Sequence, residues 1–258
     1  MEQISVASYA FHGLLRQEVM DVFGYLESVK FRYGVQADIW NGMLPTTDRD
    51  YVLKVKRALD ERGLVLANLC VDGAHIWEDD PDRREANYRT ALAHLEAGEL
   101  LGARTIRIDA GGAHDAKSFT PEQMDLIVQR YRAFAHRAEQ GGYRVGPENH
   151  WGPEVVPENM VAICEAVDHP AFGVLLHLRG NAGDREIAPW AMHTHLAWEI
   201  TEGPLEASMN MLRDAGYQGY WGVEHHTGEN EYSEVAVQVA RVRAVLDRWS
   251  QGSQVEER

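Results

Sequence analysis

The feature that most constrains the fold is a unit that recurs along the chain: an amphipathic helical stretch, a glycine or other small turn, and a short apolar run that ends in polar residues. In residues 51–70, apolar side chains recur at helical spacing as far as Arg62, Gly63 ends the helix, and LVLANLC follows as a buried strand. The expected strands cover residues 4–10, 34–39, 64–70, 105–109, 143–148, 173–177, 192–196 and 220–224. Eight strands alternating with helices over about 250 residues predict a (β/α)8 TIM barrel.

The helices expected between these strands cover residues 51–62, 86–101, 121–141, 157–167, 204–215 and 231–249. Thr120, Pro121 and Gln123 predict a helix start, because they supply an N-cap hydroxyl, a proline in the first turn and a capping-box amide. An open doubly wound sheet is the rival fold, but no GxGxxG or GxxxxGK[ST] motif follows any strand. We therefore predict a single-domain α/β protein, with the barrel over residues 1–249 and a polar tail over 250–258.

Composition limits the partners. The 258 residues carry 25 basic and 40 acidic side chains, a formal net charge of −15 with 12 neutral histidines. This charge repels a phosphate backbone, so nucleic acid is not expected as a partner.

We find neither a signal-peptide pattern nor a run of about 18 apolar residues, and expect no membrane span. Cys70 and Cys164 have no disulfide or zinc spacing, which favours a reducing cytoplasm.

Active sites of such barrels form at the C-terminal ends of the strands, so the polar residues there are candidates. Glu148, His177, His195 and Glu224 end four successive expected strands. Carboxylates and imidazoles that converge in this way suit a divalent metal with positions left open for substrate. A lone buried carboxylate at the end of an apolar strand would be costly without a partner, which argues against a purely structural role for either glutamate.

Other strand-end residues have ordinary explanations as well. For His12, Asp72 and His226 a solvated loop residue or a helix cap is the favoured explanation. Alternation places His193 and His195 on one strand face, so one can be a ligand and the other a supporting or core residue. Tryptophans at strand ends are compatible both with packing and with the wall of a sugar pocket.

Four segments carry a resemblance to a known family: GPENHWG at 146–152 before a helix that starts PENM, FGVLLHL at 172–178, HTHLAWE at 193–199 and GYQGYWGVEHH at 216–226. Over essentially its whole length the chain resembles the xylose isomerase-like TIM-barrel superfamily. Within that superfamily it resembles the sugar phosphate isomerase/epimerase group, which includes ketose 3-epimerases, hydroxypyruvate isomerase and inosose dehydratase. The resemblance implies one divalent metal held by Glu, Asp, His and Glu at the ends of strands five to eight.

Carried over to this chain, the resemblance makes Glu148 and Glu224 both metal ligands and the catalytic acid and base. His195 matches the family's histidine ligand, although Ala197 and Trp198 replace the Lys-Asp that often follows it. His177 stands where the family has Asp. Two carboxylates and two neutral imidazoles favour Mn²⁺, Co²⁺, Zn²⁺ or Fe²⁺ over Mg²⁺.

The resemblance therefore implies a metal-dependent sugar isomerase or epimerase that acts through an enediolate on a small ketose or keto-sugar. We expect the substrate to contact His12, Trp40, His150, Trp151, Arg179 and Trp198. No strong phosphate cradle is visible, which favours a non-phosphorylated sugar. A sugar dehydratase or keto-glycoside lyase, an apurinic endonuclease, against which the net charge argues, and a non-catalytic sugar-binding subunit stay open, as does a homo-oligomer.

Overall fold

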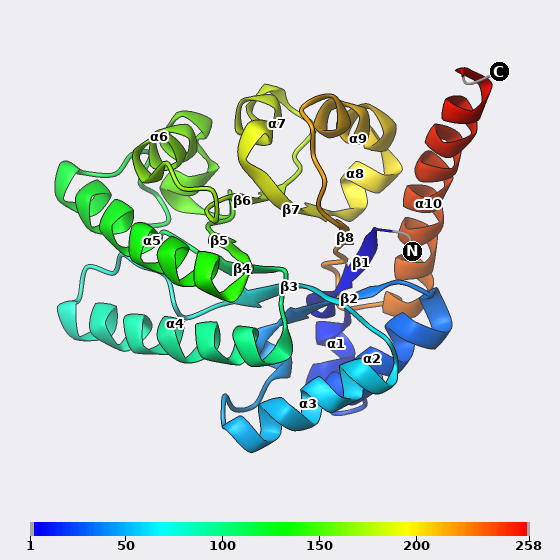
Figure 1. The fold of residues 1–258 in the computed structure, drawn as a ribbon, viewed down its shortest axis with the longest axis horizontal. Coiled ribbons are helices and arrows are strands. Elements are labelled where there is room, and N and C mark those ends of the chain that lie inside the picture. The colour runs from blue at the N-terminus through cyan, green and yellow to red at the C-terminus, as the bar shows by residue number, and fades with distance from the viewer. Residues whose placement is uncertain (1–2, 257–258) are drawn as a thin grey trace.

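The computed structural model describes residues 3–256, with side chains through Gln251. Parallel strands stand at the centre, and the helices form a ring outside them (Figure 1). The strands are β1 (Ile4–Ala7), β2 (Gln36–Trp40), β3 (Leu66–Val71), β4 (Thr105–Ile108), β5 (Arg144–Gly146), β6 (Val174–His177), β7 (Ala191–Leu196) and β8 (Trp221–Val223). Each of the eight expected strands is present, and the (β/α)8 barrel is confirmed.

The barrel is nearly closed, with a seam between β5 and β6. The strands are hydrogen-bonded in the order β5-β4-β3-β2-β1-β8-β7-β6. Across the seam there are isolated bridges, one of which joins Glu148 to Leu175. The two backbones approach closely here, because a Cβ added to Gly146 would lie 1.7 Å from the carbonyl oxygen of Gly173. Glycine at position 146 therefore lets β5 and β6 come together and brings their ends into one site.

The helices are α1 (His12–Arg16), α2 (Val22–Glu27), α3 (Arg49–Glu61), α4 (Pro81–Leu101), α5 (Pro121–Gly141), α6 (Pro157–Val167), α7 (Ala182–Ile187), α8 (Trp198–Glu202), α9 (Leu205–Asp214) and α10 (Glu231–Glu256). Short 3-10 turns cover Ser8–Phe11, Asn41–Met43, Gly152–Val155 and Ala188–Trp190, and a π-helical segment covers Ser28–Tyr33. The capping box at Thr120 is confirmed. α4 begins before residue 86, because Asp80 accepts the backbone N–H groups of Asp82 and Arg83 and so caps an earlier start.

Three further expectations concern the rest of the chain. α10 runs into the region 250–258 that we predict to be a polar tail. The last two residues lie outside the described part, so the division at residue 249 remains a prediction. Cys70 and Cys164 are both buried free thiols. Within residues 3–256, no helix combines the length and the apolar character that crossing a bilayer requires.

We predict that Gly146→Ala lowers the free energy of unfolding by about 3 kcal/mol, because the methyl group would overlap the Gly173 carbonyl. Urea unfolding followed by circular dichroism measures the change. Gly24→Ala in α2 is the control, since its Cβ would lie 3.7 Å from the nearest atom, and we expect its stability to be unchanged or slightly higher. Wild-type stability of Gly146→Ala would contradict the close approach of the two strands.

Candidate metal centre

A cavity of about 300 Å³ opens at the carboxyl ends of the strands. This volume lies at the small end of the range for small-molecule sites. The cavity is lined by Ala7, Tyr9, Asp38, Trp40, Cys70, Asp72, Arg107, Glu148, His150, His177, His195, Glu224 and His226. All of these except the alanine carry polar or aromatic side chains, so the cavity suits a small polar ligand.

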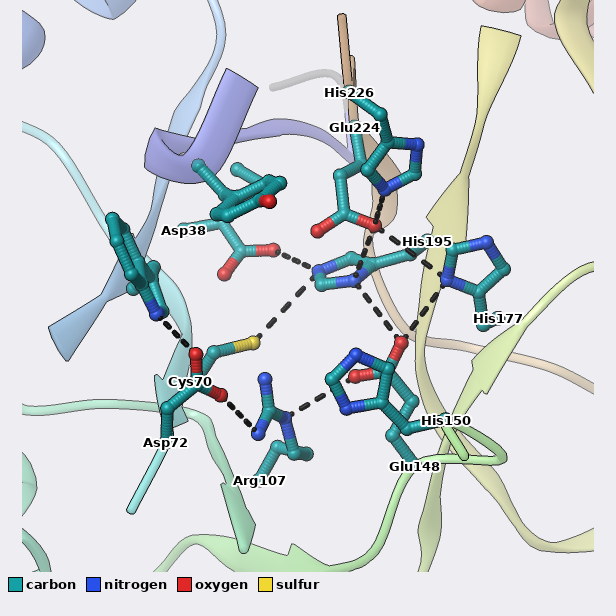
Figure 2. A pocket seen from close by; sticks show the side chains of 13 residues that line it. Asp38, Cys70, Asp72, Arg107, Glu148, His150, His177, His195, Glu224 and His226 are labelled. Carbon is teal, nitrogen blue, oxygen red and sulfur yellow. Dashed lines mark hydrogen bonds and ion pairs between the residues drawn. The ribbon is translucent and has the colours of Figure 1, made fainter. Parts of the chain in front are cut away.

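Four of the lining residues form a compact cluster (Figure 2). Glu148 follows β5, His177 ends β6, His195 lies in β7 and Glu224 follows β8. The Nδ1 atom of His177 lies 3.1 Å from Glu148 Oε1 and 3.5 Å from Glu224 Oε2. The Nδ1 atom of His195 lies 3.7 Å and 3.2 Å from the same two oxygens. Each imidazole therefore faces both carboxylates with one nitrogen.

This donor set fits a divalent cation. Metal bonds of about 2.1 Å at tetrahedral or octahedral angles separate neighbouring donor atoms by about 3.0–3.5 Å. The four donor atoms lie within 4.8 Å of one another, and the nitrogen–oxygen distances between imidazoles and carboxylates are close to that range. The Nδ1 atom of His195 is buried and makes no hydrogen bond within the described residues. A buried imidazole nitrogen aimed at two carboxylates is a position for a cation.

The electrostatics of the cluster lead to the same conclusion. Burial raises the pKa of Glu148 and of Glu224, but the surrounding positive groups outweigh it, chiefly His150 for the first and His195 for the second. Both pKa values therefore lie well below the usual range. Burial lowers the pKa of His195, but the charge of Glu224 together with the side chains of Cys70 and Asp38 more than offsets this, so that pKa is raised well above its ordinary value. The ionised glutamates thus need a cation between them, either a proton on the imidazoles or a metal.

Arg107 in β4 is a site residue that the sequence analysis missed. Its side chain is 4% exposed, and Nη1 donates to Asp72 Oδ1 at 2.8 Å and to Asp109 Oδ2 at 3.1 Å. Its Nε atom lies 3.2 Å from Glu148 Oε2. The guanidinium therefore balances the carboxylates on the β3–β5 side. A signal was present in TIRID, because strand alternation puts Arg107 on the same inward face as Thr105 and Asp109.

Two of the six predicted substrate contacts, Trp40 and His150, line the cavity. The Nε1–H group of Trp40 donates to Asp72 Oδ2 at 2.7 Å. His150 Nδ1 lies 3.0 Å from Asp109 Oδ2, and its pKa is raised to about 9, since Glu148 and Asp109 outweigh the effect of burial. Tyr9, which we did not predict, also lines the cavity.

The other four predicted contacts lie outside this lining: His12, Trp151, Arg179 and Trp198. His12 stacks on Tyr9, with ring centroids 4.5 Å apart. Arg179 donates from Nη2 to the backbone carbonyl groups of Asn149 and His150. The two tryptophans pack against histidines. His12, Arg179 and Trp198 are thus held by contacts outside this lining, whereas Trp151 lines a neighbouring cavity of about 420 Å³ that shares Asp72 and His150 with the first one. The role of all four side chains in substrate binding remains a prediction.

His193 and His195 both lie on the inner face of β7, as alternation predicts. Each Nε2 atom contacts Oδ2 of Asp38, at 2.7 Å from His193 and 3.1 Å from His195. Only His195 also reaches the carboxylates of the metal cluster. His193 is therefore the supporting residue of the pair.

Fold and site together define an α/β barrel with a candidate metal centre at the ends of its last four strands. The chain belongs to the family of the xylose isomerase-like TIM barrel, whose model matches residues 32–243. No curated protein matches the sequence.

Several solved structures are similar to the chain. One is the 3-keto-D-glucoside 4-epimerase YcjR from E. coli, with a TM-score of 0.75 and 16% identity, covering 95% of this chain and 100% of that one. A second is a D-psicose 3-epimerase solved in the presence of D-fructose, with a TM-score of 0.71 and 16% identity, covering 96% of this chain and 97% of that one. A third is a xylose isomerase-like TIM barrel protein from Mycobacterium smegmatis in complex with magnesium, with a TM-score of 0.68 and 14% identity, covering 94% of this chain and 99% of that one. At these identities the likeness establishes the fold alone.

We predict that Arg107→Met lowers the free energy of unfolding at pH 8 by about 3–5 kcal/mol, because it leaves buried carboxylates without their cation. The loss should shrink as the pH falls, since protonation then removes the unpaired negative charge. Urea unfolding at pH 8 and pH 5 measures both effects.

The control for this prediction is Arg137→Met. Arg137 binds Glu99 through two nitrogens, but its side chain is 33% exposed. We expect a loss of no more than about 1 kcal/mol. Equal losses in the two variants would contradict the role given to Arg107.

Proposed function

We propose that the chain is a divalent-metal-dependent sugar isomerase or epimerase that acts on a small, non-phosphorylated ketose or keto-sugar. The observation that carries the proposal is the cluster of two glutamates and two histidines in a small polar cavity. The names of two similar structures, a keto-glucoside epimerase and a ketose epimerase, support a sugar as the substrate. Arg107 is the one arginine among the described residues of the cavity lining, which contains no lysine, and it is already paired with three carboxylates, so it is not free to bind a phosphate group.

The residues that would hold the metal are Glu148, His177, His195 and Glu224. A bound divalent cation would polarise a substrate carbonyl and its neighbouring hydroxyl and so acidify the adjacent C–H group. The protein's own part is to move a proton away from that carbon and to return one.

The two glutamates differ in their freedom to take a proton. Glu148 Oε1 faces His177, and its Oε2 faces Arg107. Glu224 Oε2 faces the histidines, whereas its Oε1 has no hydrogen bond or ion pair within the described residues. An oxygen without a positive partner is the more basic one. We therefore assign proton removal, which leaves an enediolate, to Glu224.

Glu148 would then supply a proton to the enediolate: it would take this proton from solvent, and Glu224 would release to solvent the proton that it removed. Glu224 and Glu148 lie on opposite sides of the histidine pair (Figure 2). Delivery to the same carbon from the opposite face gives epimerisation, and delivery to the neighbouring carbon gives isomerisation. Expulsion of a substituent from the next carbon after the same proton removal would make the protein a dehydratase or lyase.

We predict that the Mn²⁺-loaded protein in D2O places deuterium on the carbon next to the carbonyl of its substrate. Incubation with a panel of free ketoses and 3-keto-glucosides, followed by NMR and mass spectrometry, measures the incorporation. Glu148→Gln and Glu224→Gln should each lower it at least 100-fold, on the order expected for loss of a general acid or base. Glu199→Gln changes an exposed carboxylate near β7 and should have no effect.

Three outcomes would contradict this proposal. Turnover without solvent isotope in substrate or product would indicate a direct hydride shift. Full exchange in both glutamine variants would remove the glutamates from the reaction. A product that lacks a substituent of the substrate would replace epimerisation with elimination.

We also predict that the site binds Mn²⁺, Co²⁺ or Zn²⁺ more tightly than Mg²⁺, because His177 supplies nitrogen where a hard cation prefers oxygen. His177→Asp should raise the Mg²⁺ affinity by about tenfold or more, since it adds an oxygen ligand and a negative charge. Isothermal titration calorimetry with each metal measures both effects. His114→Asp, at an exposed position outside the cavity lining, is the control for added charge. Equal Mg²⁺ affinities in the two variants would remove His177 from the ligand set.

A further inference from the structure

We propose that Asp38 of β2 is a positioning residue that sets the tautomer of His195 and so makes its Nδ1 atom available to a metal. The proposal rests on the metal centre of the proposed function, but not on the reaction that the centre performs. It gives a role to a fully buried carboxylate that is not itself a member of the Glu148–His177–His195–Glu224 cluster.

Asp38 controls the proton on the far side of the His195 ring. Oδ2 of Asp38 lies 2.7 Å from Nε2 of His193 and 3.1 Å from Nε2 of His195. An ionised carboxylate only accepts hydrogen bonds, so both Nε2 atoms must carry hydrogen. A neutral His195 then has its lone pair on Nδ1, the buried atom that faces the two glutamates of the cluster. Such carboxylate–histidine pairs fix the orientation of metal ligands.

The other oxygen of Asp38 is held just as firmly. Asn68 in β3 donates from Nδ2 to Asp38 Oδ1 at 3.0 Å and to Cys70 Sγ at 3.0 Å. On its other side, Asn68 Oδ1 accepts from the Thr105 hydroxyl of β4 at 2.8 Å. A reversed amide would bring its oxygen against the carboxylate, so the amide has one favourable orientation. A hydrogen-bonded relay thus runs from β4 through β3 and β2 to the metal ligand on β7.

This relay predicts an unusual effect for the isosteric change Asp38→Asn. Asn68 presents its NH2 group, so the new amide must turn its oxygen towards Asn68. Its own NH2 group then faces the Nε2 atoms of His193 and His195, which must become acceptors. The proton of His195 moves to Nδ1 and points into the cluster, where it competes with the metal.

His193→Gln provides the matched control. His193 contacts the same Asp38 oxygen and is equally buried, but it is not part of the Glu148–His177–His195–Glu224 cluster. A glutamine amide can still donate to Asp38, so the pair formed by Asp38 and His195 is preserved. The control therefore disturbs the same buried layer without changing the tautomer of the ligand.

The test is titration of the metal-free wild type, Asp38→Asn and His193→Gln with Zn²⁺ and with Mn²⁺, by competition with a chromophoric chelator. We expect Asp38→Asn to bind each metal at least 10–100-fold more weakly, and His193→Gln to stay within about threefold of the wild type. Wild-type affinity in Asp38→Asn, or an equal loss in both variants, would overturn the proposal.

A second measurement does not depend on either variant. In the Zn²⁺-loaded wild type labelled with ¹⁵N-histidine, NMR should show the proton of His195 on Nε2 and zinc on Nδ1. Zinc on Nε2 would overturn the proposal even if Asp38→Asn fails to fold. If the relay is confirmed but no sugar exchanges deuterium, the proposed reaction is wrong while the role of Asp38 stands.

Discussion

Two buried glutamates that share one pair of imidazoles are the constraint on which the rest of the site depends. Ionised carboxylates removed from water must be compensated by positive charge or by hydrogen-bond donors. Histidines lie between Glu148 and Glu224, Arg107 pairs with the outer oxygen of Glu148, and His226 contacts Glu224 at 3.0 Å. The positive groups of the cavity are therefore arranged around the negative ones, which makes a cation the natural ligand at the centre.

The open seam of the barrel helps to position this cluster. Between β5 and β6 the regular ladder gives way to isolated bridges. At the C-terminal end of β6, the side chain of Asn149 makes the hydrogen bonds that the backbone of a paired strand would make. Its Nδ2 group donates to the His177 carbonyl at 2.9 Å, and its Oδ1 atom accepts the His177 N–H at 2.7 Å. Two strands that are only loosely paired are thus clamped at the point where Glu148 and His177 must meet.

The sequence predicts what depends on local pattern. Alternation of helix, glycine and apolar strand is repeated often enough to define the barrel, and strand ends then indicate where Glu148, His177, His195 and Glu224 meet. Arg107 was missed because an arginine inside a strand reads as an outward residue until the carboxylates that neutralise it are known. These carboxylates are those of Asp72, Asp109 and Glu148, and only the folded barrel brings them together at the ends of β3, β4 and β5.

Strand-end position also does not say whether a side chain turns into the cavity or packs behind it. Trp40 turns inward because Asp72, directly after the neighbouring strand β3, accepts its N–H group. Arg179 turns to the backbone of the β5 loop, where free carbonyl groups accept its hydrogens. In both cases the partner is distant in sequence, so the choice follows from tertiary contacts.

Beneath the candidate metal cluster, the inside of the barrel is lined by a polar layer that consists of Asp38, Asn68 and Thr105. The inside of such barrels is commonly filled by branched apolar side chains. Burying Asp38, Asn68 and Thr105 is costly unless each polar group finds a partner, and here hydrogen bonds link all three in series. A barrel stabilised by packing alone would not need such a layer. Its direction, from β4 across the interior to His195, indicates that it orients a ligand. Under the proposed function, the polar side chains inside the barrel and the asymmetric environments of the two glutamates have one explanation: the barrel would fix every donor around a cation and leave one oxygen of Glu224 free to act on the substrate.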